Sequence, residues 1–127
     1  ERAPHASLTI EPISPEGVAG YFLDDFDMAA EIVSGLNAPN LGLQLDTFHA
    51  YHLCGDIAAL WQRIGPMVRH VQIGGAPGRN EPDTGAVDHQ AFFRMLDGAG
   101  YRGWVSAEYT PARQTRHGLG WLAAARS

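Results

Sequence analysis

The stretch 41-LGLQLD-46 indicates the architecture of this chain. Leucine occupies every second position, and successive side chains of a strand point to opposite faces, so one face of this segment is apolar. The other face carries Gly42, Gln44 and Asp46 and becomes polar towards its C-terminal end. The pattern predicts a strand over residues 41–48 that packs against helices on one side only.

Three further stretches repeat this alternation, and we expect strands over residues 7–13, 69–74 and 104–109. Helices are predicted over residues 24–36, after a cap at Asp56, after a cap at Asp88, and over residues 118–126. The Gly- and Pro-rich loop at 75–87 is long enough to suggest a functional or mobile segment. Four strand–helix alternations indicate parallel strands joined by right-handed crossovers.

The polar strand faces favour a barrel over a doubly wound sheet. A doubly wound sheet requires two apolar faces because helices cover both of them. A (β/α)₈ barrel of the TIM type has helices only outside, and its chemistry lies at the C-terminal rim of the strands. A whole barrel takes about 250 residues, and this chain has 127. The fold expected is therefore α/β, with four βα units forming half of a barrel.

One oxygen-bearing side chain ends the polar face of each predicted strand. These four residues are Glu11, Asp46, Gln72 and Glu108. In a closed barrel they would converge, and burying three carboxylates without a cation or protons is costly. An oxygen-only set favours Mg²⁺ or Mn²⁺ over zinc. The alternative is that each residue singly caps a helix or anchors a loop.

Charge and composition limit the classes of partner that this chain can bind. The formal net charge of −5 argues against nucleic acid as a partner. No apolar run approaches the roughly 20 residues of a membrane span, and no signal peptide is visible. The single cysteine, Cys54, fits a reducing compartment. We therefore expect a cytoplasmic protein that binds neither nucleic acid nor a membrane.

Several motifs, in order along nearly the whole chain, resemble those of the hydroxypyruvate isomerase family, which belongs to the xylose isomerase-like barrels. They are IEPI at 10–13, GYFL at 20–23, APNL at 38–41, QLDTFH at 44–49, HVQI at 70–73, PGRNEP at 77–82, GYRGWV at 100–105, EY at 108–109 and GLGWL at 118–122. The resemblance departs at Gly75, where the family often has Asp, and at 83-DTGA-86, where it often has Gly-Thr-Gly-Glu.

The resemblance implies that residues 1–127 are the C-terminal half of such a barrel, strands five to eight. It implies interconversion of hydroxypyruvate and 2-hydroxy-3-oxopropanoate through an enediolate. Matched residue by residue, it assigns the metal ligands to the same four residues that the strand faces indicate. Glu11 and Glu108 become the acid–base pair, with substrate contacts at His49, Arg79 and Glu81.

Other readings stay open. The chain could act on a related sugar or 2-oxo acid as an isomerase or epimerase, or it could be a catalytically silent half-barrel that serves binding or assembly. An endonuclease of the related barrel group would need several His ligands for zinc and a basic surface. Because an open half-barrel exposes strand edges, we expect either self-association or a missing N-terminal half.

Overall fold

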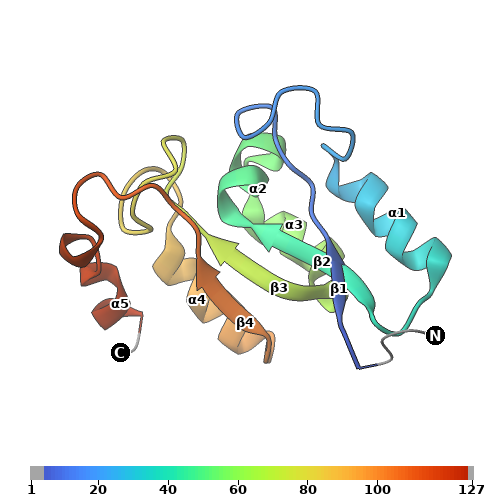
Figure 1. Ribbon diagram of the computed structural model, residues 1–127. Helices are drawn as coiled ribbons and strands as arrows, with labels where there is room; N and C mark the ends of the chain where they lie inside the picture. The colour runs from blue at the N-terminus through green and yellow to red at the C-terminus, as the bar shows by residue number, and fades with distance from the viewer. Residues whose placement is uncertain (1–4, 126–127) are drawn as a thin grey trace.

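Four parallel strands form one sheet in the computed structural model, which describes residues 5–125 (Figure 1). The strands lie in the order of the sequence, and each pairs with the next in parallel. They are β1 (Leu8–Ile10), β2 (Leu41–Asp46), β3 (Val68–Ile73) and β4 (Trp104–Ala107). The predicted parallel α/β fold is confirmed, although three of the strands are shorter than expected.

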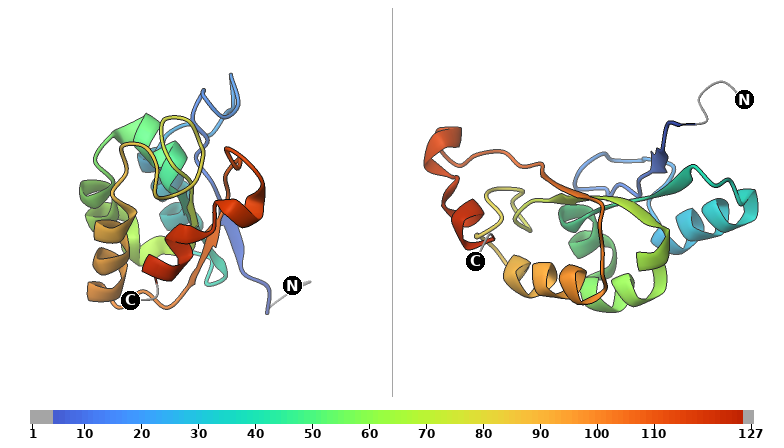
Figure 2. Two further views of the ribbon diagram at one scale, coloured as in Figure 1. Left: turned by 90° about the vertical axis from the view of Figure 1, so that its left-hand side faces the viewer. Right: turned by 90° about the horizontal axis from the view of Figure 1, so that it is seen from below.

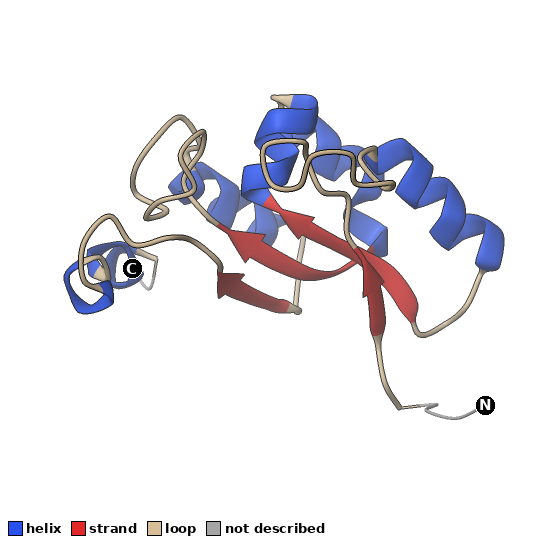
Figure 3. Cartoon of the chain, turned by 45° about the horizontal axis from the view of Figure 1, so that its top comes forward, coloured by secondary structure: helices blue, strands red, loops and turns tan. Residues whose placement is uncertain are grey.

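The helices cover one face of the sheet, as Figures 2 and 3 show, and leave the other face open. They are α1 (Phe26–Leu36), α2 (Thr47–Cys54), α3 (Ile57–Ile64), α4 (His89–Gly98) and α5 (Gly120–Ala124), with 3₁₀ turns at Gly65–Met67 and Thr115–His117. Arg126, the predicted end of the last helix, lies outside the described residues. Within residues 5–125, none of these helices has the length and apolarity needed to cross a bilayer.

Helix α2 was not expected, because the strand pattern was extended to Phe48. The chain turns at Asp46, whose side-chain Oδ1 accepts a hydrogen bond of 2.8 Å from the Phe48 N–H. Such an N-cap satisfies a backbone donor that the first helical turn leaves free. A local side-chain contact therefore ends β2 and starts α2 at the same residue.

The hydrophobic core lies between the sheet and the helices. From the sheet, Leu43, Leu45, Val71 and Ile73 are almost fully buried. From the helices, the core takes Phe26, Leu60, Ile64, Phe92 and Leu96. Burying one such side chain stabilises the fold by about 1.5–3 kcal/mol. The leucine face of β2 therefore packs as predicted, and the polar face is left on the open side of the sheet.

Strands β1 and β4 are the two edges of the sheet. Leu8 in β1 is 60% exposed, and Trp104 and Val105 in β4 are 83% and 38% exposed. An unpaired edge presents backbone donors and acceptors to any other strand. Both edges also expose apolar side chains, and burying this surface against another chain would be favourable.

His89 is a buried polar residue beside the core. It is the first residue of α4 and is 4% exposed. Its Nε2 lies 3.0 Å from Thr47 Oγ1, which links α4 to the start of α2. Burial lowers the pKa of His89, since the charged imidazolium loses hydration there.

We predict that acidification destabilises the chain through His89. The pKa of His89 is below the value of about 6.5 that holds in the unfolded chain. The folded state then binds fewer protons, so this stability is complete above pH 6.5 and is lost as the pH falls below it. Urea unfolding between pH 7 and 5 should show His89→Gln flattening the slope by up to about 1 kcal/mol per pH unit. His5→Gln, at an exposed position, is the control; equal slopes in both variants contradict the prediction.

We also propose that the isolated chain associates with a second copy of itself. The two edges of one copy could pair with the two edges of another in parallel, which would close eight strands. Light scattering should report a dimer, and Trp104→Arg should shift it towards monomer. Leu36→Arg, at a position of α1 that is 65% exposed, is the control and should leave the dimer unchanged. A stable monomer of the unmodified chain at all concentrations overturns the proposal.

Candidate metal and substrate site

Polar side chains gather where the parallel strands end, on the open side of the sheet. Asp46 is the last residue of β2 and pairs in register with Gln72 of β3. Glu11 follows β1 directly, and Glu108 follows β4, continuing the ladder through its N–H to the Ile73 carbonyl at 2.9 Å. Because these strands are parallel and consecutive, their C-terminal ends lie together along the same end of the sheet.

Three side chains of types that can ligate metals lie close together there. Glu11, Asp46 and His49 each offer one ligand atom, and these atoms lie within 4.8 Å of one another. Asp46 is fully buried and His49 is 2% exposed, whereas Glu108 is half exposed. The open side of the sheet explains the exposure of Glu108, since nothing in residues 5–125 covers β4 on that side.

Negative charge is crowded in this group. Burial, followed by the negative charges of Asp46 and Glu108, raises the pKa of Glu11 to about 7. Burial also raises the pKa of Asp46. Within the described residues, Glu11 Oε1 is buried and has no hydrogen-bond partner. An unpartnered buried oxygen among carboxylates fits a divalent cation.

Arg79 reaches the same carboxylates from the loop after β3. Its Nη2 lies 2.7 Å from Asp46 Oδ2 and 3.4 Å from Glu108 Oε2. The guanidinium also lies over the Phe48 ring, 4.9 Å from its centroid. Arg79 adopts a positive φ of 56°, which is uncommon for a side-chain-bearing residue. The loop therefore places the Arg79 guanidinium beside Asp46 and Glu108, and its predicted contact with substrate stays a prediction.

His49 has a defined tautomer. Its Nδ1 lies 3.1 Å from the backbone N–H of Ser14, which donates to it. A ring nitrogen that accepts a hydrogen bond carries no proton, so in the neutral ring the proton is on Nε2. Burial, followed by the nearby charge of Arg79, lowers the pKa of His49 to about 4, which keeps the ring neutral. With Nε2 protonated and 3.9 Å from Asp46 Oδ2, His49 is suited to donate a hydrogen bond and not to ligate a metal.

Gln44 links two of the predicted ligands and was given no role from the sequence. Its Nε2 donates to Glu11 Oε2 at 2.8 Å and also to Gln72 Oε1. Gln44 stands two residues before Asp46 on the same face of β2. That alternation was the available signal, but a strand pattern alone does not show which polar side chain bridges to its neighbours.

Glu81 lies apart from the carboxylates. Both of its oxygens accept the Ala112 N–H, at 3.1 and 3.2 Å, and the side chain is 7% exposed. A side chain at Gly118 would collide with its carboxylate. Glu81 thus ties the loop after β3 to the segment after β4, and its predicted contact with substrate stays a prediction.

The loop after β3 is built and ordered by internal hydrogen bonds. Gly75 N–H donates to the Asn80 carbonyl at 2.8 Å, and Ala86 N–H donates to the Ala76 carbonyl at 2.7 Å. A Cβ at Gly75 would lie 2.5 Å from the Glu81 carbonyl. The absence of a side chain at position 75 therefore lets the loop fold back closely beside Arg79.

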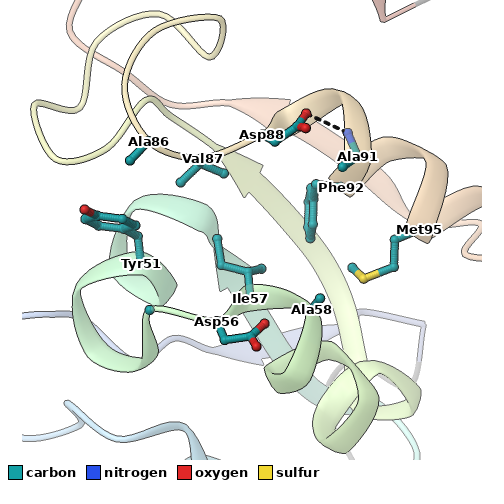
Figure 4. A pocket seen from close by; sticks show the side chains of 11 residues that line it. Tyr51, Asp56, Ile57, Ala58, Ala86, Val87, Asp88, Ala91, Phe92 and Met95 are labelled. Atoms are coloured by element: carbon teal, nitrogen blue, oxygen red, sulfur yellow. Dashed lines mark hydrogen bonds between the residues drawn. The ribbon is translucent and has the colours of Figure 1, made fainter.

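A pocket of about 470 Å³ opens elsewhere, between the α2–α3 turn and the start of α4 (Figure 4). Tyr51, Ile57, Phe92 and Met95 make it largely apolar. Its lining includes none of the seven residues predicted for metal or substrate. The candidate metal and substrate site therefore lies at the strand ends and is separate from this pocket.

Comparison with known proteins supports the same family. The model of the xylose isomerase-like TIM barrel family matches residues 3–125. The chain is 39% identical over 116 residues to a 2-oxo-tetronate isomerase of Cupriavidus necator, covering 91% of this chain and 45% of that protein. It is 30% identical to the hydroxypyruvate isomerase of Escherichia coli, with the same two coverages.

Solved structures show the same fold. A crystal structure described as an AP endonuclease of family 2 from Brucella melitensis matches with a TM-score of 0.89 and 37% identity, over 93% of this chain and 46% of that one. The 3-keto-D-glucoside 4-epimerase of E. coli matches with a TM-score of 0.81 at 20% identity, over the same shares, and this likeness shows the fold alone. The chain spans about half the length of the curated relatives that it matches. With its parallel strands and its convergent carboxylates, the chain belongs to the xylose isomerase-like TIM barrel family.

Proposed function

We propose that the chain is the C-terminal half of a metal-dependent isomerase that interconverts hydroxypyruvate and 2-hydroxy-3-oxopropanoate. The observation that carries the proposal is that ligand atoms of Glu11 and Asp46 lie within 4.8 Å of each other, near enough to Glu108 for its charge to raise the pKa of Glu11, while Glu11 Oε1 is buried and unpartnered within the described residues. Relatives named hydroxypyruvate isomerase and 2-oxo-tetronate isomerase support the reaction class. Glu11, Asp46, Gln72 and Glu108 are the proposed ligands of Mg²⁺ or Mn²⁺.

Each ligand is prepared by a different contact. Asp46 Oδ1 is occupied by the cap of α2, which leaves Oδ2 directed at the site. Glu11 Oε2 is held by Gln44, which leaves Oε1. When bound, a divalent ion would stabilise negative charge that develops on the substrate oxygens.

The reaction needs one proton to move between adjacent carbons. A carboxylate removes a proton from C3 of hydroxypyruvate to give an enediolate, the proton of the C3 hydroxyl passes to the C2 oxygen, and the proton returned to C2 gives the aldehyde product. We assign this exchange to the carboxylates of Glu11 and Glu108. Arg79 is placed to hold the substrate carboxylate by charge-assisted hydrogen bonds, and His49 Nε2–H to donate to a substrate oxygen.

A four-carbon 2-oxo acid is the second candidate substrate. Two relatives named 2-oxo-tetronate isomerase, at 39% and 38% identity, favour it. Arg79 could bind the carboxylate of either acid, and the same proton transfer would convert either one. The site therefore does not distinguish hydroxypyruvate from 2-oxo-tetronate as substrate. Parallel assays with hydroxypyruvate and 2-oxo-tetronate, followed by proton NMR, rank the two.

An endonuclease function fits the residues less well, despite the name carried by the Brucella structure. Zinc sites of hydrolases favour several His ligands, whereas the proposed ligands here are oxygens. A net charge of −5 also opposes binding to a phosphate backbone.

A silent half-barrel remains the competing hypothesis, because the relatives are about twice as long. It predicts Mn²⁺ binding by the chain without turnover, alone or with a separately supplied N-terminal half from a relative. The isomerase proposal predicts turnover at least in the second mixture. No Mn²⁺ binding by the unmodified chain would overturn both hypotheses about the metal.

Glu108→Gln tests the acid–base pair. The amide cannot accept or return a proton, so turnover in the active mixture should fall by about 10²–10⁴-fold. Mn²⁺ affinity should also fall, since a charged ligand is lost. Asp97→Asn, an exposed position on α4, is the matched control and should leave both quantities unchanged. Turnover of Glu108→Gln at the unmodified rate would remove Glu108 from the mechanism.

Arg79→Met tests two roles of the guanidinium at once. Loss of a cation that contacts Asp46 and Glu108 should raise the affinity for Mn²⁺, measured by calorimetry. Loss of charge-assisted hydrogen bonds should raise the KM for hydroxypyruvate by about 10–100-fold. Arg79→Lys keeps the charge without the planar fork and should show an intermediate KM. An unchanged KM in Arg79→Met would exclude Arg79 as the carboxylate holder.

A further inference from the structure

We propose that Gln44 is a positioning residue that orients two of the metal ligands, Glu11 and Gln72, by donating one hydrogen bond to each. The inference rests on the metal site proposed above and deepens it. Neither the polar strand faces nor the family resemblance gives this residue a role. It acts through other side chains and is not itself a proposed ligand.

The place of Gln44 in the sheet makes the bridge possible. It lies in β2, with β1 on one side and β3 on the other. Its side chain is on the open face, between Glu11 at the end of β1 and Gln72 in β3. Gln44 pairs in register with His70, so Gln72 is its diagonal neighbour in β3, and diagonal positions lie within reach of long side chains. A residue in a central strand can therefore hold ligands from both neighbouring strands.

The donors of Gln44 are fully used in this arrangement. A primary amide nitrogen has two N–H groups. One is directed at Glu11 Oε2, 2.8 Å away, and the other at Gln72 Oε1. Both partners are acceptors, so a flipped Gln44 amide would set its carbonyl oxygen against two other oxygens. The hydrogen-bond network therefore fixes which end of the Gln44 amide faces the site.

Thr9 supports the same orientation from β1. Its hydroxyl donates to Gln44 Oε1 at 3.4 Å, a long and correspondingly weak contact. The three strands thus contribute an ordered series, in which Thr9 orients Gln44 and Gln44 orients the two ligands.

The consequence for the ligands is specific to single atoms. Gln44 occupies Glu11 Oε2, and Oε1 is the oxygen left buried without a partner. Gln44 also holds the carbonyl end of the Gln72 amide, because a flipped Gln72 would oppose N–H to N–H. A cation needs the oxygen of Gln72 and would be repelled by its N–H groups. Gln44 therefore presents the atoms that a hard cation requires.

Gln44→Met keeps the length of the side chain and removes both donors. Loss of a contact that orients metal ligands commonly costs 10–100-fold in metal affinity, and we expect a loss in that range for Mn²⁺, measured by calorimetry. The electron paramagnetic resonance spectrum of the Mn²⁺ complex at saturation should also change, because the ligands lose their fixed orientation. Thermal unfolding in EDTA reports whether the fold is intact. Gln62→Met, on an exposed position of α3, is the matched control.

Thr9 provides a second pair of variants in case Gln44→Met does not fold. Thr9→Val removes the hydroxyl and should weaken Mn²⁺ binding by a smaller factor, whereas Thr9→Ser keeps the hydroxyl and should bind as the unmodified chain does.

The outcomes separate this inference from the function on which it rests. If the unmodified chain binds no Mn²⁺, the metal site fails and the role of Gln44 fails with it. If the unmodified chain binds and a folded Gln44→Met binds equally with the same spectrum, only the role of Gln44 is overturned. If Gln44→Met is unfolded, equal affinities of Thr9→Val and Thr9→Ser overturn it instead.

Discussion

Repulsion among carboxylates is the constraint on which the candidate site depends. Parallel strands bring Glu11, Asp46 and Glu108 to the C-terminal end of the sheet. Burial there removes much of the water that would screen their charges. Folding such a group is unfavourable unless positive charge or protons balance it. Arg79 supplies part of that balance from the loop after β3. The loop, the strand ends and any bound cation are therefore parts of one electrostatic arrangement.

The fold and much of the site could be predicted because both depend on a short-range pattern. Alternation in β2 separates Leu43 and Leu45 from Gln44 and Asp46, and the structure buries the two leucines on the helix side. Parallel pairing then places the ends of neighbouring strands together without further information. The family motifs add Arg79, which the structure brings to Asp46, although its position in a long loop could not be derived from periodicity.

Other features depend on particular side-chain contacts, one local and two between distant parts of the chain, and the sequence pattern did not reveal them. Helix α2 exists because the Asp46 side chain competes with strand pairing for the Phe48 N–H. His89 is buried because α4 packs beside Thr47, 42 residues away in the sequence. Glu81 binds Ala112 across two loops. The last two depend on tertiary packing, which a local reading of residue types does not contain.

The two oxygens of Asp46 serve different structures. Oδ1 caps α2, while Oδ2 faces Arg79 and His49. One residue thus serves both the fold and the proposed metal site, and a substitution that removes its side-chain oxygens would remove the cap of α2 together with a proposed ligand. Asparagine at position 46 would retain the cap and lose the negative charge. This one substitution would therefore remove the proposed metal binding and leave the fold intact.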